Sequence, residues 1–370
     1  MTEPKPCRAH CIDTLDGVEA LGPEWAALER RTPEATGFQS FVWCSTWLRL
    51  SGSSVTPRII CVREGERLVY LLPLQIERRF GVAVARWIGE PMTQYGDALA
   101  LPGERRAHWR RLAEAEMARW RDVDLVALTR LRADGVLAGG ASEGETLAAP
   151  YADLTGWKPR RRKSLERRLR RLDAMGPVAL VEAATPERRE TLACHGVALK
   201  RLWLRSKGFY SAGLSHPVSG DFIASLARDG FLRINALTVG DETVALDLGF
   251  LSGGAYRSLL GCFDLRFAEG SPGQALTARL IARCAADGLS TYDMLLPADP
   301  YKLEWSTGEV AIGARFLPTN AKGRVAAFAL SRLRPLAKRA LHALAAFSFR
   351  RNRASLSPFG EKDAISCLRE

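Results

Sequence analysis

Residues 258–274 read SLLGCFDLRFAEGSPGQ, an apolar, strand-like run that leads through a glycine-bearing turn into a helix. Ser271 is a residue type favoured at a helix N-cap, and Pro272 suits the first helical position. Gln274 lies three residues after Ser271 and completes the Ser-x-x-Gln pattern of a capping box. The stretch therefore predicts a strand, a tight turn and a helix that begins at Pro272.

The same turn is a candidate anion-binding site. Gly270 and Gly273 remove side chains where the main chain would have to approach a ligand closely. The free N–H groups and the dipole at a helix N-terminus favour a phosphate or pyrophosphate group. The turn is neither a P-loop nor a GxGxxG sequence, so it does not favour ATP or NAD. A well-capped helix without a ligand explains the turn equally well.

Two similar sets of strands and helices extend outward from this turn. In the C-terminal half, short glycine-bearing turns separate three strand-like runs that precede this turn, and a helix and a further strand follow it. The first half of the chain repeats this order after a hairpin-like turn at Glu64-Gly65-Glu66. We therefore predict an α+β fold with a duplicated unit. Its expected parts are a flexible N-terminus (1–20), an N-terminal half (21–150), a C-terminal half (151–320) and a basic amphipathic tail (321–370).

The net charge of +12 is concentrated in two segments. Residues 158–171 and residues 321–370 each carry a net charge of +8, so the other 306 residues sum to about −4. No signal segment or membrane-spanning run is present, and the eight cysteines lack paired metal-ligand spacing. These features predict a cytoplasmic, reduced protein that binds no metal.

The basic segments offer surfaces for acidic partners. In residues 158–171, helical spacing places Leu165, Leu169 and Leu172 on one stripe and the arginines elsewhere. Such a helix is either a solvated amphipathic helix or an attractor of an acidic polymer, an acyl-CoA phosphate or nucleic acid. Residues 323–353 read as a basic amphipathic helix that suits an anionic membrane surface or a biosynthetic complex. No DNA-reading motif accompanies either segment, so specific nucleic-acid binding is not expected.

Three ordered pieces resemble the CelD/BcsL family of GNAT-type acetyltransferases, which is associated with cellulose and exopolysaccharide synthesis. The first comprises Phe38-Gln39 with Trp43 and Trp47, the run Leu71-Leu72-Pro73-Leu74, and Tyr95-Gly96-Asp97; the second is Ser258–Asp264 leading to Ser271-Pro272-Gly273; the third is Gly288–Asp293 followed by Asp299, Tyr301-Lys302 and Trp305. Together they match the family in order and approximate spacing across residues 20–320.

The resemblance implies a tandem GNAT fold, similar to that of the Fem-type aminoacyltransferases, with acetyl-CoA or another acyl-CoA as co-substrate. It assigns the pyrophosphate of CoA to the turn formed by Gly270, Ser271, Pro272, Gly273 and Gln274. That turn departs from the usual Gln/Arg-x-x-Gly-x-Gly/Ala form of single-domain GNAT enzymes. The chain also lacks a long coiled-coil arm between its halves, which argues against a tRNA-dependent Fem-type role.

Acyl transfer needs positioning, a proton acceptor and donors for an oxyanion. Asp247, Asp264 and Asp293 interrupt or close apolar strands, where burial would raise the pKa of a carboxyl group. Each is a candidate base, and each is alternatively a turn cap or a salt-bridge partner. Tyr301 is a candidate proton donor, with Lys302 beside it. Trp305, Tyr95 and Asp97 are candidate substrate contacts.

Three functions remain open from the sequence. The first is an acyl-CoA-dependent acyltransferase that acts on an amine or hydroxyl of a small-molecule or saccharide acceptor, in polysaccharide or cell-envelope biosynthesis. The second is a catalytically silent GNAT-like scaffold of a biosynthetic complex. The third is a Fem-type transferase that uses aminoacyl-tRNA. The expected location is cytoplasmic, with peripheral contact at the inner membrane.

Overall fold

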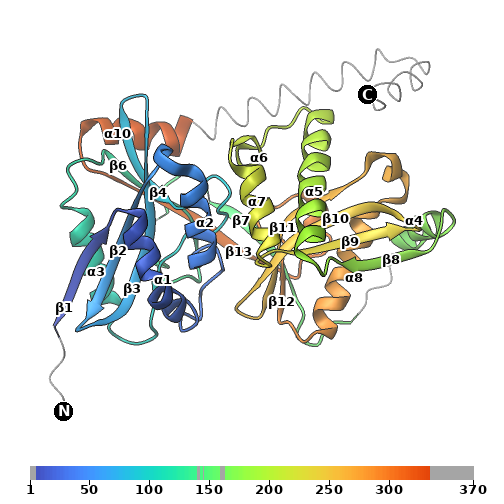
Figure 1. Ribbon diagram of the computed structural model, residues 1–370, viewed down its shortest axis with the longest axis horizontal. Helices are drawn as coiled ribbons and strands as arrows, with labels where there is room; N and C mark the ends of the chain where they lie inside the picture. The colour runs from blue at the N-terminus through green and yellow to red at the C-terminus, as the bar shows by residue number, and fades with distance from the viewer. Residues whose placement is uncertain (1–5, 140–141, 145, 159–162, 334–370) are drawn as a thin grey trace.

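One mixed sheet runs through both halves of the molecule (Figure 1). The computed structural model describes residues 6–139, 142–144, 146–158 and 163–333. Within them, the 13-stranded sheet has the order β1-β2-β3-β4-β6-β13-β7-β12-β11-β10-β9-β8, with β5 paired to β3. The predicted α+β class is confirmed.

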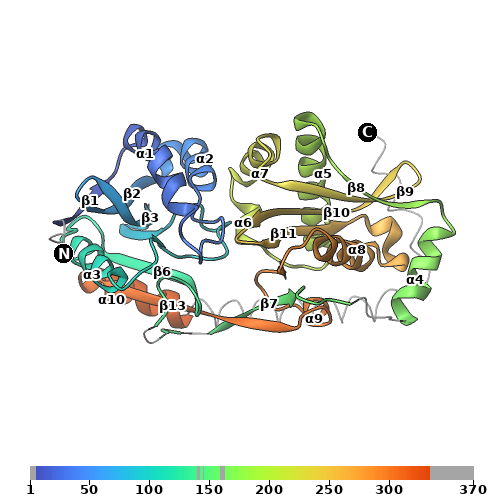
Figure 2. The same cartoon turned by 90° about the horizontal axis from the view of Figure 1, so that it is seen from below.

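The N-terminal half has helices on both faces of its sheet. Its strands are β1 (Cys7–Ile12), β2 (Thr56–Glu64), β3 (Arg67–Arg79), β4 (Val82–Trp87), β5 (Leu99–Ala100) and β6 (Leu125–Arg132). Helices α1 (Leu15–Glu29) and α2 (Phe41–Ser51) cover one face, and α3 (Arg106–Met117) covers the other (Figure 2). The predicted hairpin at Glu64-Gly65-Glu66 joins β2 to β3, and Gly65 has a positive φ of 60°.

The C-terminal half repeats this arrangement. Its strands are β7 (Leu147–Asp153), β8 (Val178–Glu182), β9 (Arg233–Val239), β10 (Glu242–Ser252), β11 (Ala255–Phe263) and β12 (Thr291–Asp293). Its helices are α4 (Lys163–Asp173), α5 (Pro186–Ser206), α6 (Ala212–Ser215), α7 (Ser219–Arg228), α8 (Pro272–Ala286) and α9 (Pro300–Leu303). Helices α5 and α7 lie on one side of the sheet and α8 on the other (Figure 2).

Strand β13 (Gly308–Pro318) joins the two halves. Residues 308–312 pair with β7, and residues 312–318 pair with β6 of the N-terminal half. A segment assigned by sequence to the C-terminal half therefore completes the sheet of the N-terminal half. Helix α10 (Ala321–Phe328) then packs on β13, β6 and β4.

The expected flexible N-terminus over residues 1–20 is wrong for residues 7–20. Strand β1 pairs with β2 from Cys7 opposite Glu64 to Ile12 opposite Ile59. Helix α1 then begins at Leu15, where the Thr14 side chain caps it by accepting a hydrogen bond from the N–H of Gly17. Pairing and capping satisfy the main chain of this segment, so it belongs to the folded N-terminal half.

Aromatic side chains pack the two halves together. Trp43 and Trp47 of α2 are fully buried and contact Phe222 of α7 edge-to-face, at centroid distances of 4.7 and 5.1 Å. Phe38 meets Phe250 of β10 in the same way at 5.2 Å. Edge-to-face pairs of this kind stabilise a core beyond the burial of their area, by roughly 0.5–1.5 kcal/mol each. Continuous packing thus fixes the relative position of the halves.

The described parts of the two basic segments are α4 and the start of the tail. In α4, Leu165 and Leu172 are buried and Leu169 is partly buried against the core, which confirms the predicted apolar stripe. The described part of the tail consists of α10 and one further turn, Ala329–Leu333. Residues 334–370 and residues 159–162 lie outside the described residues. No helix within the described residues is long and apolar enough to span a bilayer.

Candidate functional site

A gap between two parallel strands organises the candidate site. Strand β11 pairs with β12 only where residues 255–257 lie opposite residues 291–293. Strand β11 continues to Phe263, but β12 ends at Asp293. The edge of residues 258–263 that faces β12 therefore has no strand partner among the described residues, and main-chain donors and acceptors remain open there. Helix α8 begins nine residues beyond the end of β11.

The turn before α8 does not form the predicted capping box. Ser271 has φ 51° and ψ 53°, the left-handed conformation, and its side chain makes no capping hydrogen bond. Its carbonyl instead accepts hydrogen bonds from the N–H groups of Gln274 and Ala275. A capping side chain needs an extended N-cap residue. The 3-10 turn Leu265–Gly270 ends at Ser271 and leaves this residue in the left-handed conformation. The capping-box prediction is therefore wrong.

The two glycines of this turn have different physical roles. A Cβ atom at Gly270 would lie 2.4 Å from Cδ2 of Leu172, so this glycine allows α4 to pack against the turn. A Cβ atom at Gly273 would lie 3.4 Å from Cδ1 of Phe263, which is ordinary van der Waals contact. An alanine at this position would therefore fit against Phe263 without a clash. The exposed arginines of α4, among them Arg167 and Arg170, add positive charge to this neighbourhood.

Asp247 lies at the centre of a buried hydroxyl network on β10. The hydroxyl of Tyr256 donates to Oδ1 at 2.6 Å, and the hydroxyl of Ser258 donates to Oδ2 at 2.5 Å. Asn235 on β9 donates in turn to the Tyr256 hydroxyl at 2.9 Å. Burial raises the pKa of Asp247 to about 6, against the lowering effect of the hydrogen bonds from Ser258 and Tyr256. This carboxylate can take up a proton near neutral pH.

Gly249 makes room for this network. A Cβ atom there would lie 2.4 Å from the Tyr256 hydroxyl and 2.6 Å from the carbonyl oxygen of Arg257. A register shift between Leu248 and Gly249 accompanies this close approach in the pairing of β10 with β11. The ring of Tyr256 thereby crosses above the main chain of β10 and reaches Asp247.

Asp293 connects the end of β12 to both halves. Its Oδ1 accepts hydrogen bonds from the Tyr95 hydroxyl at 2.8 Å and from the N–H of Leu295 at 3.0 Å. Its Oδ2 lies 3.4 Å from a guanidinium nitrogen of Arg132 and 3.6 Å from one of Arg257. The four groups come from four separate segments of the chain. Asp293 is thus a structural hub at the point where β11 and β12 separate.

Lys302 brings a buried cation to the same region. Helix α9 places its Nζ 3.1 Å from the carbonyl oxygen of Leu295, a residue with a positive φ of 56°. Burial lowers the pKa of Lys302 to about 8, although Asp299, Asp293 and Asp247 act to raise it. The charges of Lys302 and Asp247 therefore interact across the site. A buried ammonium group of this kind can stabilise an oxyanion.

The structure brings four predicted catalytic residues together and separates the fifth. Asp247, Asp293 and Lys302 are buried, and Tyr301, next to Lys302, is 40% exposed. Asp264 instead caps the 3-10 turn by accepting a hydrogen bond from the N–H of Arg266, and it forms an ion pair with that guanidinium at 2.7 Å. Burial opposes this interaction, but the hydrogen bonds from Arg266 hold the pKa of Asp264 below its usual value.

The predicted substrate contacts also occupy different environments. Tyr95 is buried and binds Asp293, as described above. Asp97 is buried in the N-terminal half, where it accepts hydrogen bonds from the N–H groups of Ala98, Val136 and Leu137. Trp305 is partly buried against the core of the C-terminal half. Asp97 therefore orders a loop in the N-terminal half.

Comparison with known proteins agrees with this architecture. Residues 159–303 match the family model described as an acetyltransferase (GNAT) domain. FemX has a similar structure, with a TM-score of 0.54 and 12% identity over 78% of this chain and 95% of its own. The C-terminal DUF2156 domain of an Agrobacterium fabrum protein assigned as a lysylphosphatidylglycerol synthetase has a TM-score of 0.53 and 12% identity over 85% and 95% of the two chains. The chain has a GNAT-like fold. No curated protein sequence matches it.

Tyr256 and Ser258 were not predicted as site residues. They lie two positions apart on β11, so both side chains project from the same face as Asp247 on the neighbouring strand. A polar pair at alternate positions in an otherwise apolar GNAT-like strand was the available signal. The two arginines that face Asp293 gave no such signal, because Arg132 is 161 positions away in the sequence.

Proposed function

We propose that the chain transfers an acyl group from acyl-CoA, acetyl-CoA in the first instance, to an amine or hydroxyl of an acceptor. The observation that carries this proposal is the gap beside residues 258–263, which has the N-terminus of α8 at one end and the interacting pair Asp247 and Lys302 near it. The GNAT family match over residues 159–303 supports the same reaction class. The resemblance to CelD/BcsL proteins favours a saccharide acceptor in polysaccharide or cell-envelope biosynthesis.

The charge of the residues around the gap favours the phosphate groups of CoA. The first turn of α8 offers the main-chain N–H of Gly273, since Pro272 has none and those of Gln274 and Ala275 bond to the Ser271 carbonyl. Helix α4 supplies exposed arginines close by. Both features favour a pyrophosphate. The open edge of β11 offers main-chain hydrogen bonds to the amide groups of the pantetheine arm. In this arrangement the thioester lies towards the separation point of β11 and β12.

Different side chains then carry out the separate steps of acyl transfer. The acceptor attacks the thioester carbon, a C–N or C–O bond forms, and the C–S bond breaks. The acceptor loses its proton through the Ser258 hydroxyl to Asp247, whose pKa of about 6 suits this role. The ammonium group of Lys302 stabilises the oxyanion. Tyr301 donates a proton to the leaving sulfur, and Asp293 is a positioning residue.

Titration calorimetry with acetyl-CoA tests the cofactor assignment. We expect saturable binding to the full-length protein, and a large loss of affinity in Gly273→Asp because the new carboxylate repels the pyrophosphate. The matched control is Gly273→Ala, whose Cβ has room and which should bind normally. Failure of the wild-type protein to bind acetyl-CoA would favour a silent scaffold. Equal binding by the Asp and Ala variants would contradict the placement of the pyrophosphate at this turn.

A Fem-type reaction is the second candidate, since FemX shares the fold. Aminoacyl-tRNA and acyl-CoA both present an activated acyl group, so the same pair of Asp247 and Lys302 would serve either donor. Competition between acetyl-CoA and charged tRNA for the protein distinguishes them. Tighter, salt-sensitive binding of the tRNA would favour this candidate.

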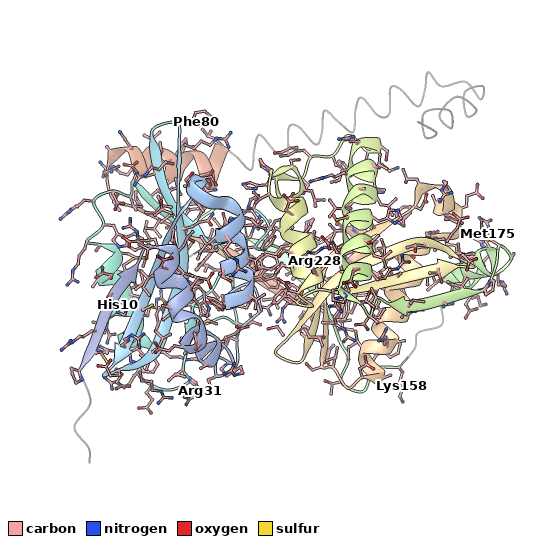
Figure 3. All side chains as sticks on the ribbon, in the orientation of Figure 1. His10, Arg31, Phe80, Lys158, Met175 and Arg228 are labelled. Atoms are coloured by element: carbon pink, nitrogen blue, oxygen red, sulfur yellow. The ribbon has the colours of Figure 1, made fainter. Side chains whose placement is uncertain are left out.

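We also propose that the protein contacts an anionic membrane surface through one edge of the N-terminal half. Phe80 lies at the tip of the β3–β4 hairpin, next to α10, and is 90% exposed (Figure 3). Val325 and Phe328 of α10 are 71% and 59% exposed. Arg79 and Lys322 add positive charge beside these apolar groups, the combination that favours an anionic bilayer surface.

Vesicle sedimentation tests this contact. The full-length protein should sediment with phosphatidylglycerol vesicles more than with phosphatidylcholine vesicles. The double variant Phe80→Ser, Phe328→Ser should sediment less, whereas Tyr210→Ser, at an exposed position in the C-terminal half, should not change sedimentation. Equal sedimentation of both variants would remove these residues from the contact.

A further inference from the structure

The N-terminal half contains a cavity of about 340 Å³ beneath α3. Its walls are largely apolar: Leu72 of β3, Leu128 of β6, and Ala113 and Met117 of α3 line it. This volume lies in the range of small-molecule sites, which are typically apolar with a few polar groups. None of its lining residues belongs to the proposed acyl-transfer site of the C-terminal half.

Four polar side chains line the same cavity. Tyr70 on β3 is 1% exposed and lines the cavity. Arg110 and Glu114 of α3 pair with each other at 2.9 Å, and Arg315 comes from β13 opposite Leu128. The Tyr70 hydroxyl can donate a hydrogen bond to a polar group in the cavity.

The cations of this cavity are incompletely neutralised. Arg315 donates to the carbonyl oxygens of Leu137 and Gly139, and it forms no ion pair with a carboxylate among the described residues. Burial, together with the nearby charge of Arg110, lowers the pKa of Arg315. Glu114 balances one of the two guanidinium groups, so the lining has a net charge of +1. An anion in the cavity would offset the repulsion between the arginines.

We propose that this cavity binds a small carboxylic acid with an apolar hydrocarbon body. The carboxylate lies at Arg315 and Arg110 and accepts the hydrogen bond of the Tyr70 hydroxyl. The hydrocarbon chain contacts Leu72, Met117 and the other apolar lining residues. Guanidinium groups suit a carboxylate because they donate in a planar, bidentate arrangement. The site is separate from acyl transfer and does not depend on that proposed function.

Calorimetric titration of the full-length protein with octanoate tests this proposal, with octan-1-ol as the uncharged analogue. We expect saturable octanoate binding and at least tenfold weaker binding of octanol. Removal of a charged hydrogen-bond partner typically weakens binding by roughly tenfold to a hundredfold. Arg315→Gln and Arg110→Gln should each lower octanoate affinity by about that factor, and Tyr70→Phe should lower it by less than either.

A cavity-filling variant provides the structural control. Ala113→Phe places a ring in the cavity and should abolish octanoate binding, while the exposed change Arg111→Gln on the same helix should leave it unchanged. Thermal unfolding checks that each variant is folded. If Ala113→Phe does not fold, Arg110→Gln still tests the proposal. The proposal is overturned by the absence of saturable octanoate binding, by equal affinity for octanol, or by wild-type affinity in both arginine variants.

Discussion

Asp247 and Lys302 are buried side chains of opposite charge whose pKa values are shifted towards neutrality from opposite sides. Burial raises the pKa of Asp247 to about 6 and lowers that of Lys302 to about 8. The proposed reaction needs the ionised carboxylate and the protonated amine. Activity should therefore rise as pH increases through about 6 and fall as pH increases through about 8.

The pH profile of kcat/KM checks these two roles. We expect a bell with limbs near the two pKa values. In Lys302→Arg, the cation stays protonated at all accessible pH values, so the alkaline limb should disappear even if the maximal rate falls. If Lys302 were instead the base, the wild-type profile would rise through about 8 without a fall, and the assignment of Asp247 would be wrong.

The close approach at Gly249 makes a second prediction at the scale of single residues. Gly249→Ala should displace the Tyr256 ring and break its hydrogen bond to Asp247. We expect the free energy of unfolding to fall by about 2–4 kcal/mol, from overpacking and the lost bond to a charged group. Gly261→Ala is the matched control, because its Cβ would lie 3.8 Å from Oδ2 of Asp247. Urea unfolding should show little change for that variant.

At the scale of elements, local sequence signals predicted α8 and missed its cap. The helix begins at Pro272 as expected and ends at Ala286, where Gly288 follows two residues later. The conformation of Ser271 depends on the preceding 3-10 turn, which a capping pattern does not encode.

Paired serine substitutions test the corrected cap. Ser40 caps α2 by accepting a hydrogen bond from the N–H of Trp43, so Ser40→Ala should cost about 1 kcal/mol of unfolding free energy. Ser271→Ala should cost far less, since the Ser271 side chain caps nothing. A comparable loss in both variants, measured by urea unfolding, would restore the capping prediction.

Strands β1 and β13 show a second reason why elements are missed in prediction from the sequence. Both are strands whose partners are distant: β1 pairs at the sheet edge with β2, and β13 pairs with β6 and β7 more than 150 positions away. Their side chains are mostly half-buried or exposed, so neither has a strong alternating pattern. For the site, the sequence indicated Asp247, Asp293, Lys302 and Tyr95. It did not indicate the hydroxyl groups of Tyr256 and Ser258 or the two arginines that face Asp293.

At the scale of the molecule, Asp293 couples the halves electrostatically. It is the carboxylate that faces both Arg132 and Arg257, and it accepts the hydrogen bond of Tyr95. Asp293→Ala would leave two largely buried guanidinium groups without this partner, a change that typically costs about 3–5 kcal/mol. Calorimetry should show a lower midpoint, whereas Tyr95→Phe should lower it less because it removes one hydrogen bond only. An unchanged midpoint in Asp293→Ala would contradict the role of this hub.

The path of β13 has a consequence for synthesis on the ribosome. The N-terminal half emerges first, but β6 lacks one of its two neighbouring strands until residues 312–318 have been translated. During that interval the open edge of β6 can pair with another nascent chain. Residues 1–150 expressed alone should therefore aggregate, and a peptide that spans Gly308–Pro318, supplied in trans, should restore their solubility.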